Sequence, residues 1–378
     1  MQDILNFEDI RPYNDDEYHK IVQELFEVQP LMDTICDYLE LPLDEIKTLM
    51  LSYKTIQEFQ SKIVCAFINK IIKRSVGTFS YDGVLRLDKN ETYLLLSNHR
   101  DIVLDSALIN YCLNDREYNT SEIAIGSNLL SQDWIRKLVR INKSFIVKRN
   151  IPKQEMLSAS QNLSAYIYYT LKEKKQSIWI AQREGRAKDG FDKTNPGILK
   201  MFGMAANGKL LDYLISLNIT PVSLSYELDP CDGGFKVPEL LQKLKGEEYV
   251  KAKGEDEKNM ILGIQGNKGN IHIQFGTPIN EEIKQFAAIK NRNELLKNIA
   301  EVIDREVYRN YHLWNSNYVA YDLLHASDKY EPKYDENGKE KFQDYMFKQL
   351  GDLSKDKKAE NIFLQMYANP VINAEGVK

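Results

Sequence analysis

The chain has 378 residues, of which 43% are hydrophobic and 28% are charged, and its formal net charge is −5. This composition supports an ordinary folded core and excludes wholesale disorder. A chain with a net negative charge is not expected to coat nucleic acid through bulk positive charge, so no nucleic-acid partner is predicted. The length accommodates one large domain with helical additions, or two domains.

Targeting and redox signals point to an ordinary intracellular setting. The four cysteines are scattered without a CxxC pair, which favours reduced thiols: Cys36, Cys65, Cys112 and Cys231. The acidic N-terminus lacks a basic start followed by an apolar stretch, so no secretory signal is predicted. Because no run of eighteen or more apolar residues occurs, we predict no transmembrane helix, although the protein could still lie on a membrane.

Residues 1–75 form a predicted N-terminal helical region. Its clearest signal is an apolar series at spacings of three and four, which places one face of a helix: Ile56, Phe59, Ile63, Phe67 and Ile71. Basic residues lie among them: Lys62, Lys70, Lys73 and Arg74. Two interpretations are open. The helix packs on the core, which is the more common case, or it is an amphipathic surface that contacts anionic lipid.

Residues 76–288 form the predicted central domain, in which short apolar runs alternate with longer helical patterns. Strands are expected at residues 93–96, 122–126, 144–148, 177–181, 219–226 and 271–275. Helices are expected at residues 101–113, 153–174 and 197–217. This alternation predicts the α/β class, with a mixed, largely parallel sheet flanked by helices and with added helical regions at both termini.

Residues 289–378 form a predicted C-terminal helical region. Residues 328–338 are polar and contain Pro and Gly, so they are expected to be a loop. An aromatic series at spacings of three and four predicts a helix that packs on the central domain: Tyr311, Trp314, Tyr318 and Tyr321.

His99 is the leading candidate for chemistry, because it follows a buried strand and precedes a helix. A nearby carboxylate can accept a hydrogen bond from one imidazole nitrogen while the other nitrogen takes a proton from an alcohol. Asp101 and Asp105 are both placed for that task. Each also has a structural interpretation, since Asp101 suits a helix cap and Asp105 suits the first turn of a helix.

Two basic clusters each follow a predicted strand. Lys148 and Arg149 end one strand, and the segment REGRAK follows another, at residues 183–188. Arginine offers a planar fork of donors that suits phosphate, and glycine lets the backbone approach a ligand closely. The clusters could converge on one anion if their strands are parallel neighbours. Alternatively, these cations are solvated or pair with Glu184 and Asp189.

Four segments, in this order, resemble the sequence blocks of the glycerol-phosphate acyltransferase superfamily. They are NHRDIVLD, then GSNLL with FIVKR, then REGRAKDG, and finally ITPVSLSYE followed by IHIQFGTPI. The resemblance is closest to the bacterial glycerol-3-phosphate and dihydroxyacetone-phosphate acyltransferase branch. It covers roughly residues 76–280.

Two spacings depart from the family pattern. The family places Asp after His and four further residues, but that position is Leu104 here and Asp105 comes one residue later. Asp105 is favoured over Asp101, because the apolar run after it matches the run after the family Asp. In the third block Arg186 directly follows Glu184 and Gly185, so Arg186 keeps its place while Glu184 is displaced by one.

The resemblance implies an acyltransferase in which His99 removes a proton from an acceptor hydroxyl and the oxygen attacks the thioester of acyl-CoA or acyl carrier protein (acyl-ACP). The acceptor is expected to be glycerol-3-phosphate or 1-acylglycerol-3-phosphate, its phosphate held by Arg149, Arg186, Lys188 and Lys148. Supporting positions are Glu184, Gly185 and Pro221. No cofactor or metal is expected. The implied setting is phospholipid synthesis by a cytoplasmic protein that associates peripherally with the membrane surface.

Other interpretations stay open. A metal-dependent phosphohydrolase would use His and Asp ligands, but the five histidines show no helix-face spacing with a carboxylate: His19, His99, His272, His312 and His325. A P-loop enzyme is disfavoured, because no GxxxxGK[ST] motif occurs. Acylation of a different lyso-lipid, or a lipid-binding module that keeps the fold without the chemistry, remain alternatives.

Overall fold

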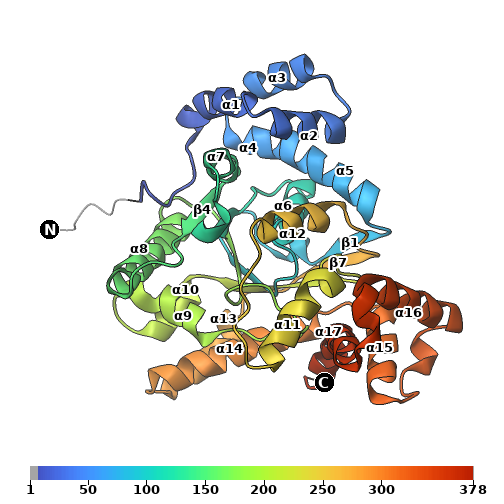
Figure 1. Ribbon diagram of the computed structural model, residues 1–378. Helices are drawn as coiled ribbons and strands as arrows, with labels where there is room; N and C mark the ends of the chain where they lie inside the picture. The colour runs from blue at the N-terminus through green and yellow to red at the C-terminus, as the bar shows by residue number, and fades with distance from the viewer. Residues whose placement is uncertain (1–6, 378) are drawn as a thin grey trace.

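The computed structural model describes residues 7–377, and within them the chain forms a seven-stranded sheet covered by helices (Figure 1). The strands lie in the order β1-β7-β6-β2-β5-β3-β4. Their bounds are β1 Phe79–Asp82, β2 Leu94–Ser97, β3 Glu122–Gly126, β4 Ser144–Val147, β5 Ile178–Ala181, β6 Ile219–Tyr226 and β7 Ile271–Phe275. In this described part all strand pairs are parallel except β6 with β7. The predicted fold class, a mixed and largely parallel sheet, is confirmed.

The six predicted strands all occur, and β1 is the strand that the sequence pattern did not reveal. Its four residues, FSYD, are mostly half-exposed and show no buried apolar run. They become a strand by pairing with β7, where Phe79 lies opposite Ile271. Because β1 is at the edge of the sheet, its hydrophobic pattern is weak, and its position depends on a segment about 190 residues away in the chain.

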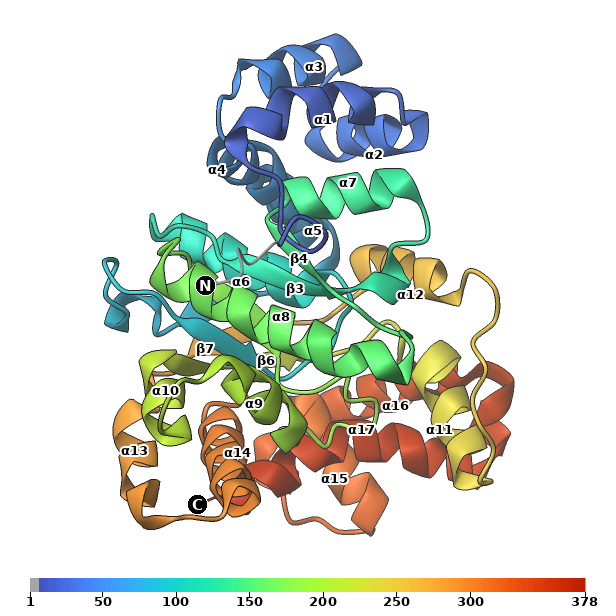
Figure 2. The same cartoon turned by 90° about the vertical axis from the view of Figure 1, so that its left-hand side faces the viewer.

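Alternate residues of the central strands feed two separate cores, which is why these strands are apolar throughout. Leu94 and Leu96 of β2 face one core, and Leu95 faces the other. The first core contains α8 (Lys153–Lys172), α9 (Pro196–Phe202), α10 (Leu210–Ser216), α13 (Asn280–Lys284) and α14 (Arg292–Arg309). Figure 2 shows α8 lying across this face of the sheet. The second core contains α5 (Cys65–Ser75) and α6 (Leu104–Asp115).

The expected helix over residues 197–217 is interrupted in its middle. Helix α9 ends at Phe202, and α10 begins only at Leu210. Between them Gly208 adopts a φ of 107°, a conformation that a helix does not contain and that glycine accepts without steric cost. The turn lets both short helices pack on the same core.

The N-terminal helices form a separate layer at the top of Figure 1. They are α1 (Tyr18–Phe26), α2 (Gln29–Leu39), α3 (Leu43–Ser52) and α4 (Ile56–Phe59), followed by α5. The apolar series of residues 56–71 is packed inside the protein: Ile63 is buried, and the ring of Phe67 lies 4.6 Å from that of Tyr38. This matches the packed-helix interpretation. On the same helix Lys70 and Arg74 form ion pairs with acidic residues of the α2 segment.

The C-terminal region is helical, as predicted, and forms the red group at the lower right of Figure 1. After α14 it comprises α15 (Asn315–His325), α16 (Glu336–Leu350) and α17 (Lys357–Glu375). The expected loop over residues 328–338 is shorter, because Asp335 caps α16 by accepting a hydrogen bond from Gly338 N–H at 2.6 Å. The boundaries of the three predicted regions stay predictions. Residues 1–6 and 378 lie outside the described residues. The first six belong to the segment on which the secretory-signal prediction rests.

Three further helices complete the fold. They are α7 (Asp133–Ile141), α11 (Val237–Leu244) and α12 (Glu255–Gln265). Within residues 7–377, the helices are all too short or too polar to cross a bilayer. All four cysteines are free thiols, and three of them are buried.

Candidate functional site

His99 lies just beyond the end of β2, a central strand of the sheet. In α/β folds, functional side chains are usually placed in the loops that follow the carboxyl ends of parallel strands. The chain then turns into α6, and Asp101 organises that turn: its Oδ1 accepts hydrogen bonds from Val103 N–H at 2.8 Å and Leu104 N–H at 2.7 Å. Asp101 therefore holds the first N–H groups of the helix, a role that its residue type favours, while Val103 occupies the N-cap position.

The imidazole of His99 is paired with Asp105. His99 Nδ1 lies 2.7 Å from Asp105 Oδ2, and the carboxylate side chain is 1% exposed whereas the imidazole is 15% exposed. The same Oδ2 accepts hydrogen bonds from the backbone N–H groups of Arg100 at 2.6 Å and Asp101 at 3.1 Å. The other oxygen, Oδ1, accepts from the Tyr226 hydroxyl at 2.9 Å. Asp105 is thus held in one orientation, toward the imidazole.

A second acidic group lies close to this pair without contacting the imidazole. Burial and the neighbouring Asp105 raise the pKa of Asp101. Helix α12 packs directly over Asp101, because a Cβ added at Gly263 would come within 2.2 Å of Asp101 Oδ2. The structure therefore separates the two candidate carboxylates: Asp105 contacts His99, and Asp101 lies under α12 as a cap.

The REGRAKDG segment is docked onto the His99 turn. Ala187 N–H donates a hydrogen bond to the His99 carbonyl oxygen at 3.1 Å. Just before it, Gly185 adopts a φ of 72°, and a Cβ built there would meet no atom within 4 Å. At the far end of the segment Gly190 is pressed against α17, since a Cβ there would come within 2.2 Å of the Met366 carbonyl oxygen. The backbone beside His99 is thus fixed at Ala187 and Gly190 and open at Gly185.

The two basic clusters meet. Arg149, after β4, forms an ion pair with Glu184, after β5, with an Nη1–Oε1 distance of 2.9 Å. The first cluster is joined to the GSNLL segment as well, because Arg149 N–H donates to Ser127 Oγ at 2.9 Å. The contact brings Arg149 and the REGRAKDG segment together, although β3 lies between β4 and β5. It matches the alternative that the sequence left open, in which a cation pairs with Glu184.

The four candidate cations differ in how far acids already neutralise them. Lys148 pairs with Asp9, and Lys188 pairs with Glu239 of α11, where burial lowers the lysine's pKa. Arg186 instead contacts a neutral group, the Asn259 side-chain oxygen on α12, at 3.3 Å, and it forms no ion pair within the described part of the chain. Arg186 is therefore the cation best placed to accept an external anion.

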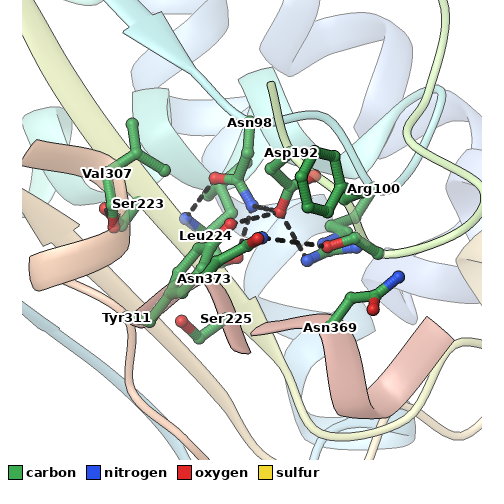
Figure 3. A network of polar contacts seen from close by, with 12 residues as sticks. Asn98, Arg100, Asp192, Ser223, Leu224, Ser225, Val307, Tyr311, Asn369 and Asn373 are labelled. Atoms are coloured by element: carbon green, nitrogen blue, oxygen red, sulfur yellow. Dashed lines mark hydrogen bonds and ion pairs between the residues drawn. The ribbon is translucent and has the colours of Figure 1, made fainter. Parts of the chain in front are cut away.

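A buried polar network around Asp192 holds Asn98 and Arg100, the two neighbours of His99 in the chain (Figure 3). Arg100 donates to Asp192 Oδ2 at 2.6 Å, and the Tyr311 hydroxyl donates to the same oxygen at 2.5 Å. Asn98 donates to it at 3.2 Å and also exchanges two hydrogen bonds with the Leu224 backbone of β6. These contacts fix the residues on both sides of His99. Tyr311, part of the aromatic series predicted to form a helix, packs on the central domain through its hydroxyl. It lies before α15, which begins at Asn315, so the predicted helix does not extend over the whole series.

The C-terminal helices also reach the site. Asn369 of α17 donates to the Asp189 carbonyl oxygen at 2.6 Å.

The segment before α11 also contacts the His99 turn. Lys236 donates to the Arg100 carbonyl oxygen at 3.0 Å and forms an ion pair with Asp229. A small pocket next to this lysine is lined by Arg100, Asp101, Tyr226, Asp229, Pro230 and Lys268.

Asp232 is a buried carboxyl that contacts two tyrosines of the C-terminal helices. The hydroxyls of Tyr345 and Tyr367 donate to its Oδ2 at 2.9 and 2.6 Å. Burial, followed by the nearby Asp229, raises the pKa of Asp232 to about 7. The carboxyl ties α16 and α17 to the segment that contacts the His99 turn.

Pro221, a predicted supporting residue, lies inside β6 opposite Leu96 of β2. Its carbonyl oxygen accepts from Gly276 N–H at 2.9 Å, and the antiparallel pairing with β7 begins one residue later, at Val222. The proline therefore stands where the ladder on the β7 side starts, which suits a residue without an N–H group. Among residues 7–377 no group of three or more His, Cys, Asp or Glu side chains is arranged to hold a metal ion.

Comparisons with known proteins add little to this geometry. No protein-family model and no curated protein matches the chain. Among solved structures, the chain is similar to the 1-acyl-sn-glycerophosphate (LPA) acyltransferase PlsC from Thermotoga maritima. The two are 12% identical, the match covers 77% of this chain and 95% of the other, and the TM-score is 0.36. A likeness of this degree carries no argument about chemistry.

Proposed function

We propose that the protein transfers a fatty acyl group from a thioester donor, acyl-CoA or acyl-ACP, to a hydroxyl of a glycerol-phosphate-type acceptor. The observation that carries the proposal is the contact between His99 Nδ1 and a buried, fully oriented Asp105 carboxylate. A carboxylate in that position fixes the tautomer that bears its proton on Nδ1, so Nε2 is the nitrogen that can act as a base. The sequence blocks around His99 support acyl transfer among the reactions that such a pair can serve.

The proposed reaction is one direct transfer. His99 Nε2 takes the proton of the acceptor hydroxyl as its oxygen attacks the thioester carbonyl carbon. The C–S bond then breaks, and the thiolate leaves with the proton that the imidazolium returns. General-base assistance of this kind contributes about 10²–10⁴ in rate. Asp105 stabilises the imidazolium in between, and the bonds from Arg100 and Asp101 N–H keep it in place.

Arg186 and Arg149 are proposed to hold the acceptor's phosphate. Arg186 lies on the segment whose Ala187 contacts the His99 carbonyl. It forms no ion pair among residues 7–377, and Asp101 and Asp229 act on its charge only from a greater distance. Arg149 is paired with Glu184, whose side chain is 68% exposed, so an incoming phosphate can replace that carboxylate at low cost. Lys188 is a weaker candidate, because the buried Glu239 already neutralises it. Lys148 is weaker because it lacks the planar donor fork of arginine and shares its charge with Asp9.

An acceptor screen tests the proposal. Purified protein would be incubated with labelled acyl-CoA or acyl-ACP and with glycerol-3-phosphate, 1-acylglycerol-3-phosphate, other lyso-lipids or unphosphorylated glycerol, and the products would be identified. We expect an acylated phosphate-bearing product from the wild type and none from H99A. H99A should unfold at nearly the wild-type temperature. Transfer by H99A at the wild-type rate would refute the role of His99. Lipid binding without turnover by the wild type would instead favour a non-catalytic member of the fold.

Peripheral association with a membrane surface is part of the proposal, since an acylated product is a lipid. The apolar face of residues 56–71 is covered by protein, so that helix does not supply the contact. Sedimentation with anionic vesicles at low salt is the test. Failure to sediment at any lipid concentration would count against membrane association while leaving acyl transfer open.

A further inference from the structure

We propose that Tyr226 is a positioning residue of the His99–Asp105 pair, which anchors the carboxylate oxygen that the backbone does not hold. The inference rests on the proposed function for its kinetic consequence, but its structural consequence can be measured without activity. Tyr226 lies near the end of the ITPVSLSYE segment, in which the sequence singled out only Pro221, and its contact with Asp105 bridges about 120 residues of chain.

Strand β6 places the phenol by running further than its neighbour. The last paired residue of β2 is Ser97, opposite Val222, and beyond it the chain leaves the sheet for the His99 turn. Strand β6 continues to Tyr226, held on its other side by β7, where Tyr226 pairs with Ile271. The tyrosine therefore extends from a rigid strand alongside the turn that carries His99.

The hydrogen bonds of Asp105 are divided unequally between its two oxygens. Oδ2 accepts from His99 and from the backbone N–H groups of Arg100 and Asp101. Among the described residues, Oδ1 accepts only from Tyr226, at 2.9 Å. The terminal torsion of an aspartate is soft and roughly two-fold, so a carboxylate held at one oxygen alone can rotate. The phenol fixes that torsion and keeps Oδ2 directed at the imidazole.

Tyr226 stays a donor under all working conditions. Burial and the adjacent Asp105 raise the pKa of its hydroxyl well above the ordinary value. Asp101 and Asp229 act in the same direction, and the cations Arg100 and Lys268 line the same small pocket as the phenol. The hydroxyl proton is thus permanently available to Oδ1, and it draws negative charge toward that oxygen and away from the imidazole.

This sharing of charge has a predictable sign. Removal of the phenol hydroxyl leaves more negative charge on Oδ2, which stabilises the protonated imidazole. The acid limb of the kcat/KM profile, where His99 must lose its proton to act as a base, should then move to higher pH. A loss of folding alone would lower the amount of active enzyme without moving that limb.

The test compares Y226F with Y249F. The control also removes a tyrosine hydroxyl bonded to a carboxylate, Tyr249 to Glu255 at 2.8 Å, but away from His99. We expect Y226F to lower kcat about tenfold to a hundredfold, with the acceptor KM within about twofold and the acid limb moved upward. Y249F should match the wild type. Wild-type kcat and an unmoved limb in Y226F would overturn the proposal.

Two further measurements test the proposal, and the second of them does not depend on acyl transfer. The first is the kcat of the double variant Y226F/D105N. If the tyrosine acts through Asp105, Y226F should lower kcat hardly at all once D105N is present, whereas two independent effects would multiply. The downfield NMR signal of the His99 Nδ1 proton, identified by its loss in H99N, should shift or broaden in Y226F and not in Y249F. An unchanged signal in Y226F would refute the positioning role even if the wild type transferred no acyl group.

Discussion

His99 Nδ1 contacts Asp105 Oδ2 at 2.7 Å, although five residues lie between the two in the chain. In the acyltransferase pattern that the sequence resembles, four residues separate the His from the Asp, and the turn after His99 accommodates the one additional residue found here. Asp101 accepts from Val103 and Leu104 N–H, and this cap starts α6 at Leu104, so that Asp105 falls in the first helical turn and points back at His99. The longer spacing is therefore compatible with a paired imidazole.

This arrangement predicts unequal effects of the same substitution at the two aspartates. D105N removes the acceptor of the Nδ1 proton and should lower kcat about 10²–10⁴-fold. D101N keeps an effective cap residue and should change kcat less than about threefold. Steady-state kinetics on both purified variants checks the prediction. An equal loss in the two variants would show that Asp101 also takes part in the chemistry.

Arg186 forms no ion pair within the described residues, and this predicts a strong effect on acceptor binding. R186A should raise the KM for a phosphorylated acceptor about tenfold or more, because a charge-assisted contact to phosphate is lost. K148A is the comparison variant, and its acceptor KM should rise less than that of R186A, because Lys148 shares its charge with Asp9 and lacks the planar donor fork of arginine. Acceptor KM values for both variants, measured at two salt concentrations, are the readout. A larger effect of K148A would reverse the assignment.

The contact between α17 and the REGRAKDG segment predicts an effect at a distance. Asn369 donates to the Asp189 carbonyl oxygen at 2.6 Å, and N369A should loosen the segment that carries Arg186. One hydrogen bond is worth about 1 kcal/mol, so acceptor KM should rise up to about fivefold with kcat nearly unchanged. Hydrogen exchange of residues 186–190 should quicken. K357A, at the exposed start of the same helix, should leave both measurements unaltered.

Two glycines predict opposite effects of an added methyl group. G263A brings a Cβ against Asp101 Oδ2, and Asp101 cannot move away without losing its cap bonds, so the variant should be destabilised by about 1–3 kcal/mol. G234A meets no atom within 4 Å and lies in a helical segment, so it should be neutral or slightly stabilising. Denaturant unfolding of the two variants distinguishes them. A stable G263A would mean that α12 shifts freely over the site.

Asp232 predicts a stability that falls as pH rises. Its pKa in the folded protein is about 7, above the ordinary value of 3.8, so between these values the folded state holds a proton that the unfolded state has lost. The stabilisation is present at low pH and is lost as the pH rises toward 7. Relative to D232N, which cannot ionise, the wild type should lose about 2 kcal/mol between pH 5 and pH 7. Urea unfolding at several pH values tests this, and parallel curves would contradict it.

The central strands were predictable from sequence, because burial on both faces requires unbroken apolar runs. Strands such as β3 and β6 occupy the predicted residues, whereas β1 escaped because FSYD has no such run. The helices of residues 237–265 were not foreseen either. Helix α12 buries polar groups, including Glu255 and Asn259, so its inward face does not read as apolar.

Within the site, contacts between residues close together in the sequence could be predicted, whereas contacts with distant residues could not. His99 and both aspartates lie in one short segment, so their proximity follows from local geometry. Tyr226 lies in ITPVSLSYE and Asp192 just after REGRAKDG, but both contact the His99 segment only after the sheet has formed, so neither pattern identifies the contact. The pairing of Lys148 with Asp9 is also long-range, and it decides how much of that lysine's charge is free.

The strand order has a consequence for how the chain acquires its structure. The partners of β2 are β5 and β6, more than 80 residues away, and β1 is completed only by β7. Contacts of such high sequence separation slow folding, because the loop entropy is lost before the contacts form. A nascent chain that has been synthesised only to residue 270 lacks β7, the strand that pairs with β6 and lies opposite Tyr226. The His99 turn can therefore reach its final geometry only late in synthesis.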